Sequence, residues 1–426
     1  MNMLKLVAEK SIYLLAALAV LAVSFSLQSL QIVQIGFIGV IFLAWAVFSL
    51  IFGISVRNSL IFCSFFFIKP IPTSFYCVLI ILLITFIFEY QNSHPLVIPY
   101  PIALIVLLLT SCYGLMRARE FYYSTQYFAA TALVPLILFI LLGNSKLQKE
   151  DFILWIKFVV LIGIGLSIIG VFMSLTHPEQ RLGSLWVTAM TINGYYTLAF
   201  FFSIALGIEA ENSNNKYVWF IGAIIILLGM FYTYTRMALL AVLFGLLLII
   251  IMVKKLRYVG MLLLLLIPLL IPSSMISRIK LGLTFDYSIV IRFIAWSNAL
   301  QQIKLAPWFG MGIDVWKHWY AAIIPIDFLY AEHPHNIFLK IWVELGIFGF
   351  LSYFYIIGAT VRKYYLHLVK RKKDYFNTII FIGILALLFA CLTDIFIQQF
   401  SISIVFWITL AFMYRLAKNK TQGELQ

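Results

Sequence analysis

Residues 217–253 decide the fold. They read YVWFIGAIIILLGMFYTYTRMALLAVLFGLLLIIIMV, an apolar run of 37 residues with a single charge, Arg236, near its middle. A helix crosses a bilayer with about 20 apolar residues, so this run is long enough for two spans that join at Arg236. Because backbone polar groups inside hydrocarbon must be satisfied within the segment, the run predicts a helical hairpin in a membrane.

The rest of the chain has the same character. Of its 426 residues, 64% are hydrophobic and only 11% are charged, whereas soluble domains carry about 25% charged residues. So few charges cannot cover a soluble surface. The net charge of +14 lies in short clusters between apolar runs, a pattern that indicates membrane topology and no nucleic-acid partner. The four cysteines form no CxxC pattern, so neither a disulfide framework nor a cysteine metal site is indicated.

Thirteen segments are apolar enough to cross a membrane, or nearly so. They are 11–27, 32–53, 72–90, 99–116, 121–142, 152–174, 191–208, 217–235, 237–253, 257–272, 336–360, 377–394 and 400–415. We therefore predict an all-α polytopic membrane protein with about 12–14 transmembrane helices. Residues 1–426 should form a single integral membrane domain, in which 273–335 is one long outer loop.

Lysine and arginine accumulate in short cytoplasmic loops. The basic cluster at 362–373 places the loop 361–376 inside and the loop 273–335 outside. In the first third, five apolar segments precede Lys146, which implies an outside N-terminus, whereas Lys5 and Lys10 favour a retained first helix that starts inside. A further crossing between Asn58 and Lys69 would remove this conflict, but about 11 residues are too few for an ordinary span.

Basic residues are disfavoured in outer loops, so an arginine on the outer side indicates a specific role such as binding an anion. Arg181, Arg236 and Arg292 all fall on that side. Arginine binds phosphate oxygens bidentately and does not lose its proton, so converging arginines suit a pyrophosphate. Taken alone, Arg292 fits a structural role at the membrane surface as well as a binding role, and a structural role is favoured for Arg236 and Arg181.

Arg292 belongs to the stretch 289–312, IVIRFIAWSNALQQIKLAPWFGMG. Its apolar residues recur every three or four positions, while polar residues interrupt any spanning pattern, so it predicts an amphipathic helix on the outer surface. Pro307, Gly310 and Gly312 should then end this helix in a turn.

Histidines mark the end of the outer loop. Residues 331–351 read AEHPHNIFLKIWVELGIFGFL, with His333 and His335 directly before a predicted span. A histidine there is able to accept a proton from a hydroxyl nucleophile. A metal held by the two histidines, for which no third ligand is recognisable, and a purely structural turn are the alternatives. Asp394, in CLTDIFIQQF, is predicted on the same side, at the end of the penultimate helix, and pairing with an arginine is its structural alternative.

The succession of QRLG, TYTRMALL, IVIRFIAWSNALQQIKLAPWFGMG, HPHNIFLKIWVELGIFGFL and LTD resembles the superfamily of O-antigen ligases and Wzy-type polymerases, over roughly 175–400. The resemblance implies a GT-C-like glycosyltransferase of the bacterial inner membrane. It implies transfer of a glycan, at the periplasmic face, from undecaprenyl pyrophosphate to a hydroxyl of lipid A-core, with no cofactor and no metal. Arg236 and Arg292 match arginines that hold the pyrophosphate, and His335 matches the histidine that activates the acceptor. Matches to substrate-binding positions are Arg181, Arg278, His333, Asn336 and Asp394.

The motifs do not specify the acceptor. A polymerase uses the same donor but a second lipid-linked glycan as acceptor, and an oligosaccharyltransferase uses a protein hydroxyl. A polytopic transporter is an alternative from another class. Transporters carry internal repeats and ionisable groups near the bilayer midplane, whereas here no repeat is recognisable and the polar candidates gather on one face.

Overall fold

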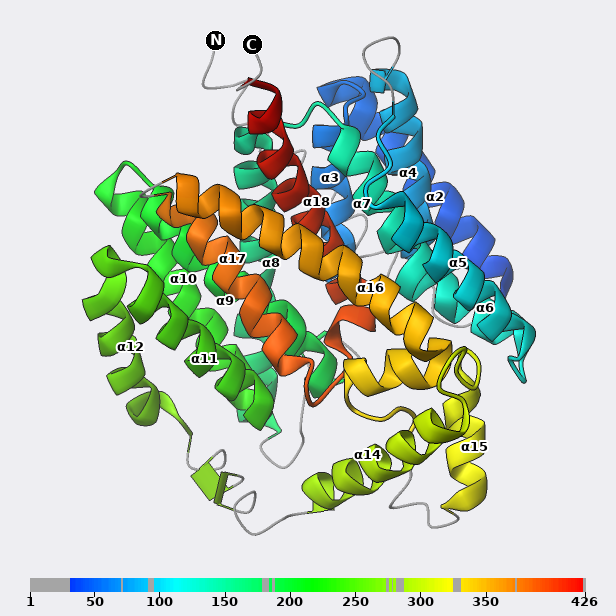
Figure 1. Cartoon of the computed structure of the whole chain (residues 1–426). Coiled ribbons are helices and arrows are strands. Elements are labelled where there is room, and N and C mark those ends of the chain that lie inside the picture. The colour runs from blue at the N-terminus through cyan, green and yellow to red at the C-terminus, as the bar shows by residue number, and fades with distance from the viewer. Residues whose placement is uncertain are drawn as a thin grey trace.

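The computed structural model of the chain is an assembly of packed helices (Figure 1), with no strand among the residues it describes. Those residues are 31–69, 72–90, 96–177, 184–185, 188–272, 276–277, 279–280, 287–324, 331–371 and 374–423. The predicted first helix at 11–27 and parts of the loop 273–335 lie outside them. The predicted all-α polytopic class is confirmed. The GT-C-like relationship and the single-domain boundaries stay predictions.

The first half of the chain forms α2 (Gln31–Phe52), α3 (Val56–Ser64), η1 (Phe65–Phe67), α4 (Pro72–Tyr90), α5 (Pro101–Met116), α6 (Phe121–Phe128), the π-helical η2 (Ala129–Leu133), α7 (Val134–Asn144), α8 (Lys149–Thr176) and α9 (Ala189–Glu209). The second half forms α10 (Ser213–Tyr232), α11 (Arg236–Met252), η3 (Lys254–Leu256), α12 (Arg257–Leu270), α14 (Tyr287–Leu305), α15 (Val315–Ile323), α16 (Ile337–Lys370), α17 (Tyr375–Ala390), η5 (Phe396–Gln398) and α18 (Phe400–Gly423).

Six described helices are long and apolar enough to cross a membrane: Phe121–Asn144, Lys149–Thr176, Ala189–Glu209, Ser213–Tyr232, Ile337–Lys370 and Phe400–Lys418. The bent pair formed by α11 and α12 adds a seventh if it counts as one span, and five shorter apolar helices accompany them. α9 lies at the centre, with 89% of its most apolar window buried. It has apolar residues all round and packs against α8, α10 and α17, as expected for a helix with no lipid-facing stripe.

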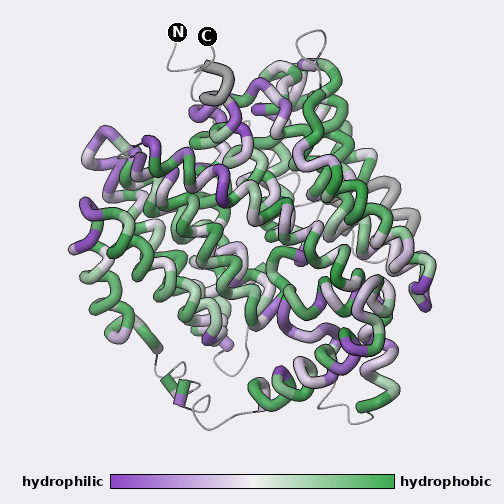
Figure 2. Tube along the Cα trace, in the orientation of Figure 1, coloured by the Kyte–Doolittle hydropathy of each residue, from purple (hydrophilic) through white to green (hydrophobic). Residues whose placement is uncertain are grey.

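Basic side chains gather at one end of the bundle, which we call the basic end. There Lys149 pairs with Glu209, with 2.6 Å between Nζ and Oε1, and also lies over the Phe376 ring, while Lys255 lies over Tyr375. Figure 2 shows hydrophilic turns at this end. The predicted helix end near residue 360 is wrong, because α16 continues as a helix to Lys370, while the placement of 361–376 on the inner side stays a prediction. The amphipathic sequence beyond the apolar part simply extends the same helix.

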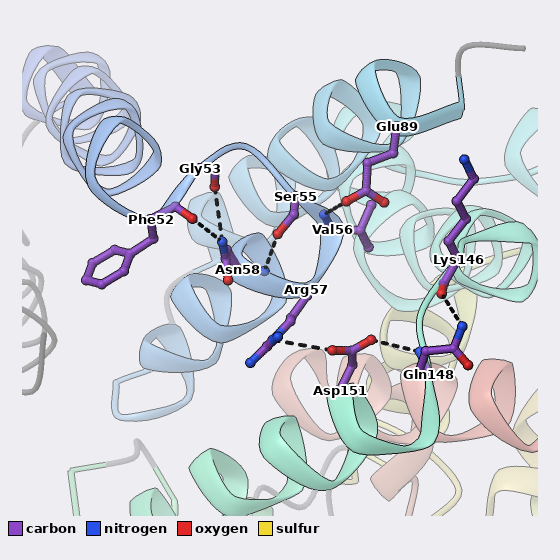
Figure 3. Close-up of polar contacts among 10 residues, drawn as sticks. All are labelled: Phe52, Gly53, Ser55, Val56, Arg57, Asn58, Glu89, Lys146, Gln148 and Asp151. Atoms are coloured by element: carbon purple, nitrogen blue, oxygen red, sulfur yellow. Dashed lines mark hydrogen bonds and ion pairs between the residues drawn. The ribbon is translucent and has the colours of Figure 1, made fainter. Parts of the chain in front are cut away.

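A short helix, α3 with η1, occupies 56–67, where a further crossing would remove the conflict over sides in the first third. Gly53, with φ +84°, reverses the chain after α2, and Ser55 caps α3 by accepting a hydrogen bond from the Asn58 amide. Glu89 at the end of α4 accepts from Val56 N at 2.8 Å (Figure 3), so α2 ends, α3 begins and α4 ends at one place. Arg57 and Asp151 join α3 to α8 there, with 3.3 Å between Nε and Oδ1. This short helix therefore starts at the place where α2 and α4 both end.

The opposite end of the bundle, which we call the site end, carries α14 and α15 below the other helices (Figure 1). The predicted helix around Arg292 is confirmed as α14, and the predicted turn follows it, but the apolar and polar residues of the helix are only weakly segregated into two faces, so its amphipathic character is not confirmed. This turn packs against a break in α16 at Gly346, where φ is +66° and ψ is −173°. Met311 N donates to Val343 O at 2.7 Å, and Ile347 N donates to Pro307 O at 2.8 Å. The loop thus satisfies backbone groups that the break leaves without helical partners.

Only glycine fits at the centre of this contact. A Cβ on Gly346 would lie 2.2 Å from the Trp308 carbonyl oxygen, and one on Gly310 would lie 2.5 Å from the Glu344 carbonyl. Both residues also have positive φ angles, which side chains disfavour. The PWFGMG and VELGIFG motifs therefore form one structural unit, which fixes the end of α14 against α16.

Candidate active site

Arg236 and Arg292 converge on a single residue, Ser288. Arg236 begins α11, and its Nη2 donates to Ser288 Oγ at 2.7 Å. Arg292 lies one turn after Ser288 on α14, and its Nη1 donates to the Ser288 carbonyl at 2.8 Å. Two guanidinium groups that are 56 positions apart in the sequence are thus brought to the same point. Paired guanidinium groups suit an anion with several oxygens, such as a pyrophosphate.

The turn before Arg236 is held from inside the bundle by Asn193 of α9. Asn193 is fully buried, and its Nδ2 lies 2.8 Å from Thr233 Oγ1 and 2.9 Å from Thr235 Oγ1. Between the two threonines, Tyr234 adopts a left-handed φ of 54°. The TYTR motif is therefore a tight turn fixed by a buried amide, which determines where the Arg236 side chain starts.

The segment after α17 links Arg292 to the histidine turn through backbone carbonyls. Cys391 O accepts from Ile337 N at 3.1 Å, Leu392 O accepts from Asn336 Nδ2 at 2.9 Å, and Thr393 O accepts from Arg292 Nε at 3.2 Å. Asn336 was predicted as a substrate-binding residue. The structure gives its side chain a capping role, because its Oδ1 accepts from the Phe338 and Leu339 amides at the start of α16.

His333 and His335 pack against each other, with 4.4 Å between ring centroids, and His335 N donates to His333 Nδ1 at 3.2 Å. His335 has a left-handed φ of 48°. Burial, and then the nearby Arg292 charge, lower the pKa of His335 to about 4. Burial and the charges of His335, Lys340 and Arg292 hold the pKa of His333 well below its usual range. Both imidazoles are therefore neutral near pH 7, and a neutral imidazole is a proton acceptor.

Asp394 lies beside the histidines, but it does not end a helix as predicted. α17 ends at Ala390, and Asp394 is a buried residue of the irregular segment before η5, where its Oδ1 accepts from Ile395 N at 2.8 Å. One ligand-type atom from each of His333, His335 and Asp394 lies within 4.8 Å of the others. Asp394 is thus the third side chain that could complete a metal site with the two histidines, and the sequence did not reveal it. Arg292 acts electrostatically on both histidines, so a divalent cation held by these three side chains would meet a like charge nearby. The part of the site that suits an anion is the pair of guanidinium groups at Ser288.

A buried ion pair lies in α16 just beyond the histidines. Lys340 Nζ contacts Glu344 Oε1, both side chains are buried, and Lys340 lies 4.9 Å from the centre of the Tyr127 ring. Glu344 Oε1 also accepts from Asp314 N at 3.3 Å, in the loop between α14 and α15. The pair therefore fixes the outer loop to α16, which extends the contact made by the glycines.

The structure thus brings together Arg236, Arg292, His333, His335, Asn336 and Asp394 from the predicted set. Arg181 and Arg278 lie outside the described residues. Sequence reasoning missed Ser288, Asn193 and Thr393. Ser288 could have been suspected from the sequence, because it precedes Arg292 by one helical turn. Thr393 contributes only its backbone carbonyl, which any residue would provide, so its type gives no indication.

The fold and the polar group define a polytopic helical membrane protein with a potential anion site at one end of its bundle. Residues 221–354 match a family model, Wzy_C, described as O-Antigen ligase. The match confirms the resemblance to the O-antigen ligase and Wzy-type superfamily that the motifs predicted, and the matched range contains Arg236, Arg292 and His335. A search of curated proteins found no match.

Proposed function

We propose that this protein transfers a glycan from undecaprenyl pyrophosphate to an acceptor hydroxyl. The observation that carries the proposal is the convergence of Arg236 and Arg292 on Ser288. Arg292 also donates to the Thr393 carbonyl, in the segment that binds the start of α16 directly after His335. A donor with a pyrophosphate leaving group needs fixed cations, and an acceptor hydroxyl needs a base. The two kinds of group are neighbours here.

The proposed step is an inverting displacement at the anomeric carbon. The acceptor oxygen forms the new glycosidic bond, and its proton passes to neutral His335. The bond from the anomeric carbon to the pyrophosphate oxygen breaks, and the electron pair leaves with undecaprenyl pyrophosphate. Arg236 and Arg292 stabilise the charge that develops on this leaving group, and preorganised donors of this kind contribute strongly because they need no reorganisation. The residues require neither a cofactor nor a metal for this step.

The proposed location is the bacterial inner membrane, with the site on the periplasmic face. The support is the position of the site at the end of the bundle opposite the basic end, since basic clusters mark the cytoplasmic side. The Arg236 and Arg292 site then lies where a polyprenyl donor, anchored in lipid, presents its pyrophosphate.

Among acceptors we favour lipid A-core, which makes the protein an O-antigen ligase of lipopolysaccharide biosynthesis. The description of the matched family favours this choice. A Wzy-type polymerase that joins lipid-linked repeat units is the second candidate. Lipopolysaccharide from a deletion strain distinguishes them. Core without O-antigen, together with accumulated lipid-linked polymer, indicates a ligase, whereas core that carries one repeat unit indicates a polymerase.

The test of the chemistry is substitution of His335 and Arg292, followed by glycan transfer from a lipid-linked donor in proteoliposomes. His335→Ala should lower the transfer rate about 10²- to 10⁴-fold through loss of the base, and Arg292→Ala about 10²- to 10³-fold through loss of leaving-group stabilisation. Matched controls are Lys304→Ala, an exposed cation on the same helix as Arg292, and His177→Ala, an exposed histidine at the end of α8. Both controls should retain activity. Full transfer by either site variant, at normal membrane abundance, contradicts the assignment.

A further inference from the structure

A second group of arginines lies at the site end, in the turn between α5 and α6. This turn reads MRAREFYY over 116–123, and Arg117 and Arg119 are both exposed. Two contacts place the turn at the site end: Ile313 N donates to Gly114 O at 3.1 Å, and Arg117 Nη1 lies 3.5 Å from the Gly310 carbonyl. The turn is hydrophilic and lies at the edge of the molecule near α15 (Figures 1 and 2).

Bases at this end contradict the usual distribution of charge, because the other basic clusters gather at the opposite end. Nearby acids do not account for them. Glu120 Oε1 lies 3.3 Å from His318 Nε2, and Asp314 pairs with Lys317 at 2.8 Å. Among the described residues, Arg119 makes no hydrogen bond or ion pair, and Arg117 contacts only the Tyr113 side chain and one carbonyl. Two exposed guanidinium groups therefore point to an external anion.

The surroundings indicate the depth at which that anion sits. Exposed aromatic side chains flank both arginines, at positions Tyr113, Phe121, Tyr122 and Tyr123 along the chain and at Phe309 on the loop packed beside Tyr113. Aromatic residues with a polar edge are typical of the headgroup layer of a bilayer. The anion is thus expected on a lipid, at the level where its headgroup meets water.

This second anion site is separate from the one at Arg236 and Arg292. Arg292 lies near the start of α14, whereas the Arg117 contact to Gly310 lies just beyond its end. From Arg292 to Leu305, the last residue of α14, the helix runs 13 residues, which span about 20 Å. From the α5–α6 turn, α6 leads toward Tyr127, which lies against Lys340 close to the histidine turn. The two sites therefore lie toward opposite ends of α14. The site at Arg236 and Arg292 is the one that we propose for the donor.

We propose that Arg117 and Arg119 bind phosphate groups on the lipid end of the acceptor and so position a phosphorylated glycolipid for transfer. The proposal rests on the proposed function, in which the acceptor hydroxyl reaches His335. An acceptor whose phosphates lie several sugars away from its reacting hydroxyl fits two sites separated in this way. Arginine suits such phosphates because its guanidinium binds two oxygens at once.

The test is binding of a purified diphosphorylated lipid A-core to the protein in nanodiscs, in a His335→Ala background and without donor, so that no transfer takes place. Arg117→Glu with Arg119→Glu should weaken binding at least about tenfold, as expected from loss of two charge-assisted contacts. Enzymatic dephosphorylation of the glycolipid should weaken binding to the unmodified arginines by a similar factor. The controls are Lys304→Glu at the same end and Arg362→Glu on α16 at the basic end, both exposed. They should change binding less than twofold.

Three outcomes overturn the proposal: unchanged affinity in the double variant, equal binding of the dephosphorylated glycolipid, or equal competition by phosphatidylglycerol, which would make the turn a general anionic-lipid contact. With active protein, the double variant should raise the KM for acceptor and leave the rate at saturating acceptor unchanged. Because the binding assay needs no turnover, failure of the proposed chemistry appears separately, as undiminished transfer by His335→Ala.

Discussion

At the basic end, cationic side chains pair with carboxylates from neighbouring helices, as in Arg57 with Asp151 and Lys149 with Glu209. At the site end, the contacts of Arg236 and Arg292 include a serine hydroxyl and backbone carbonyls. An ion pair between exposed side chains contributes little to the stability of the fold, and its geometry depends on how both side chains are oriented. Bonds to carbonyls orient a guanidinium through the path of the backbone itself.

The difference indicates that the contacts at the basic end join helices, whereas those at the site end orient side chains. An arginine at a reacting centre must keep its orientation as charge develops. A backbone carbonyl in a packed segment fixes that orientation, because it does not move as a side-chain partner does. The Thr393 carbonyl belongs to a segment that also holds Asn336 and the first amide of α16. Orientation of Arg292 and of the histidine turn is therefore determined together.

The site end also contains ion pairs, and loss of the buried one, Lys340 with Glu344, should have the largest effect on stability. Lys340→Met leaves a buried carboxylate without its partner, which costs about 3–5 kcal/mol. The double variant Lys340→Met with Glu344→Leu removes both charges and should recover most of that loss. Thermal unfolding in detergent measures both. A double variant less stable than the single one contradicts this account of the pair.

Removal of Ser288 tests whether a shared residue aligns the two arginines. Ser288→Ala deletes the acceptor for Arg236 but keeps the carbonyl that Arg292 uses, so transfer should fall about tenfold, as expected for one charged hydrogen bond. Ser297→Ala, at another position of α14, is the matched control and should keep its rate. Equal rates for the two variants would show that Ser288 does not align Arg236.

A smaller effect is expected at the basic end. Arg57→Ala removes the ion pair with Asp151, in which the arginine side chain is 53% exposed. Such pairs contribute about 0–1 kcal/mol, so the melting temperature should shift by a few degrees at most and transfer activity should not change. A loss of several kcal/mol would mean that the α3–α8 contact resembles the buried pair at the site end.

The pH profile should show the least change over the physiological range. With its pKa lowered to about 4, His335 stays neutral above that value and becomes unable to accept a proton only as the pH falls through about 4. The rate of transfer should therefore lack an acid limb near pH 6.5, where an ordinary histidine titrates. Transfer assayed from pH 5 to 8 checks this, and a twofold or greater loss between pH 7 and 6 contradicts it.

Sequence reasoning predicted the features that local pattern encodes. Twelve apolar segments after the first coincide with described helices, and α14 follows from the spacing of apolar residues around Arg292. The pattern failed at α3, because twelve residues that include Arg57 and Asn58 are too short and too polar to be recognised as a membrane helix.

The site was predicted only in part, because its geometry depends on contacts between distant positions. Arg292 and Thr393 are 101 residues apart, and Arg236 and Ser288 are 52 apart. The motifs identified the charged residues, but no local sequence pattern indicates that Ser288 contacts both arginines. Carbonyl acceptors are equally invisible in a sequence, since every residue has one.

The break in α16 has a consequence for biogenesis. Its partner loop, Pro307–Gly312, is synthesised before α16, so the groups that satisfy the broken helix are already present when that helix enters the membrane. A fragment that begins after residue 312 would bring the same break into lipid with those carbonyls and amides exposed, which is costly in hydrocarbon. Split versions of this protein should therefore assemble only when the cut leaves the loop and α16 on the same piece.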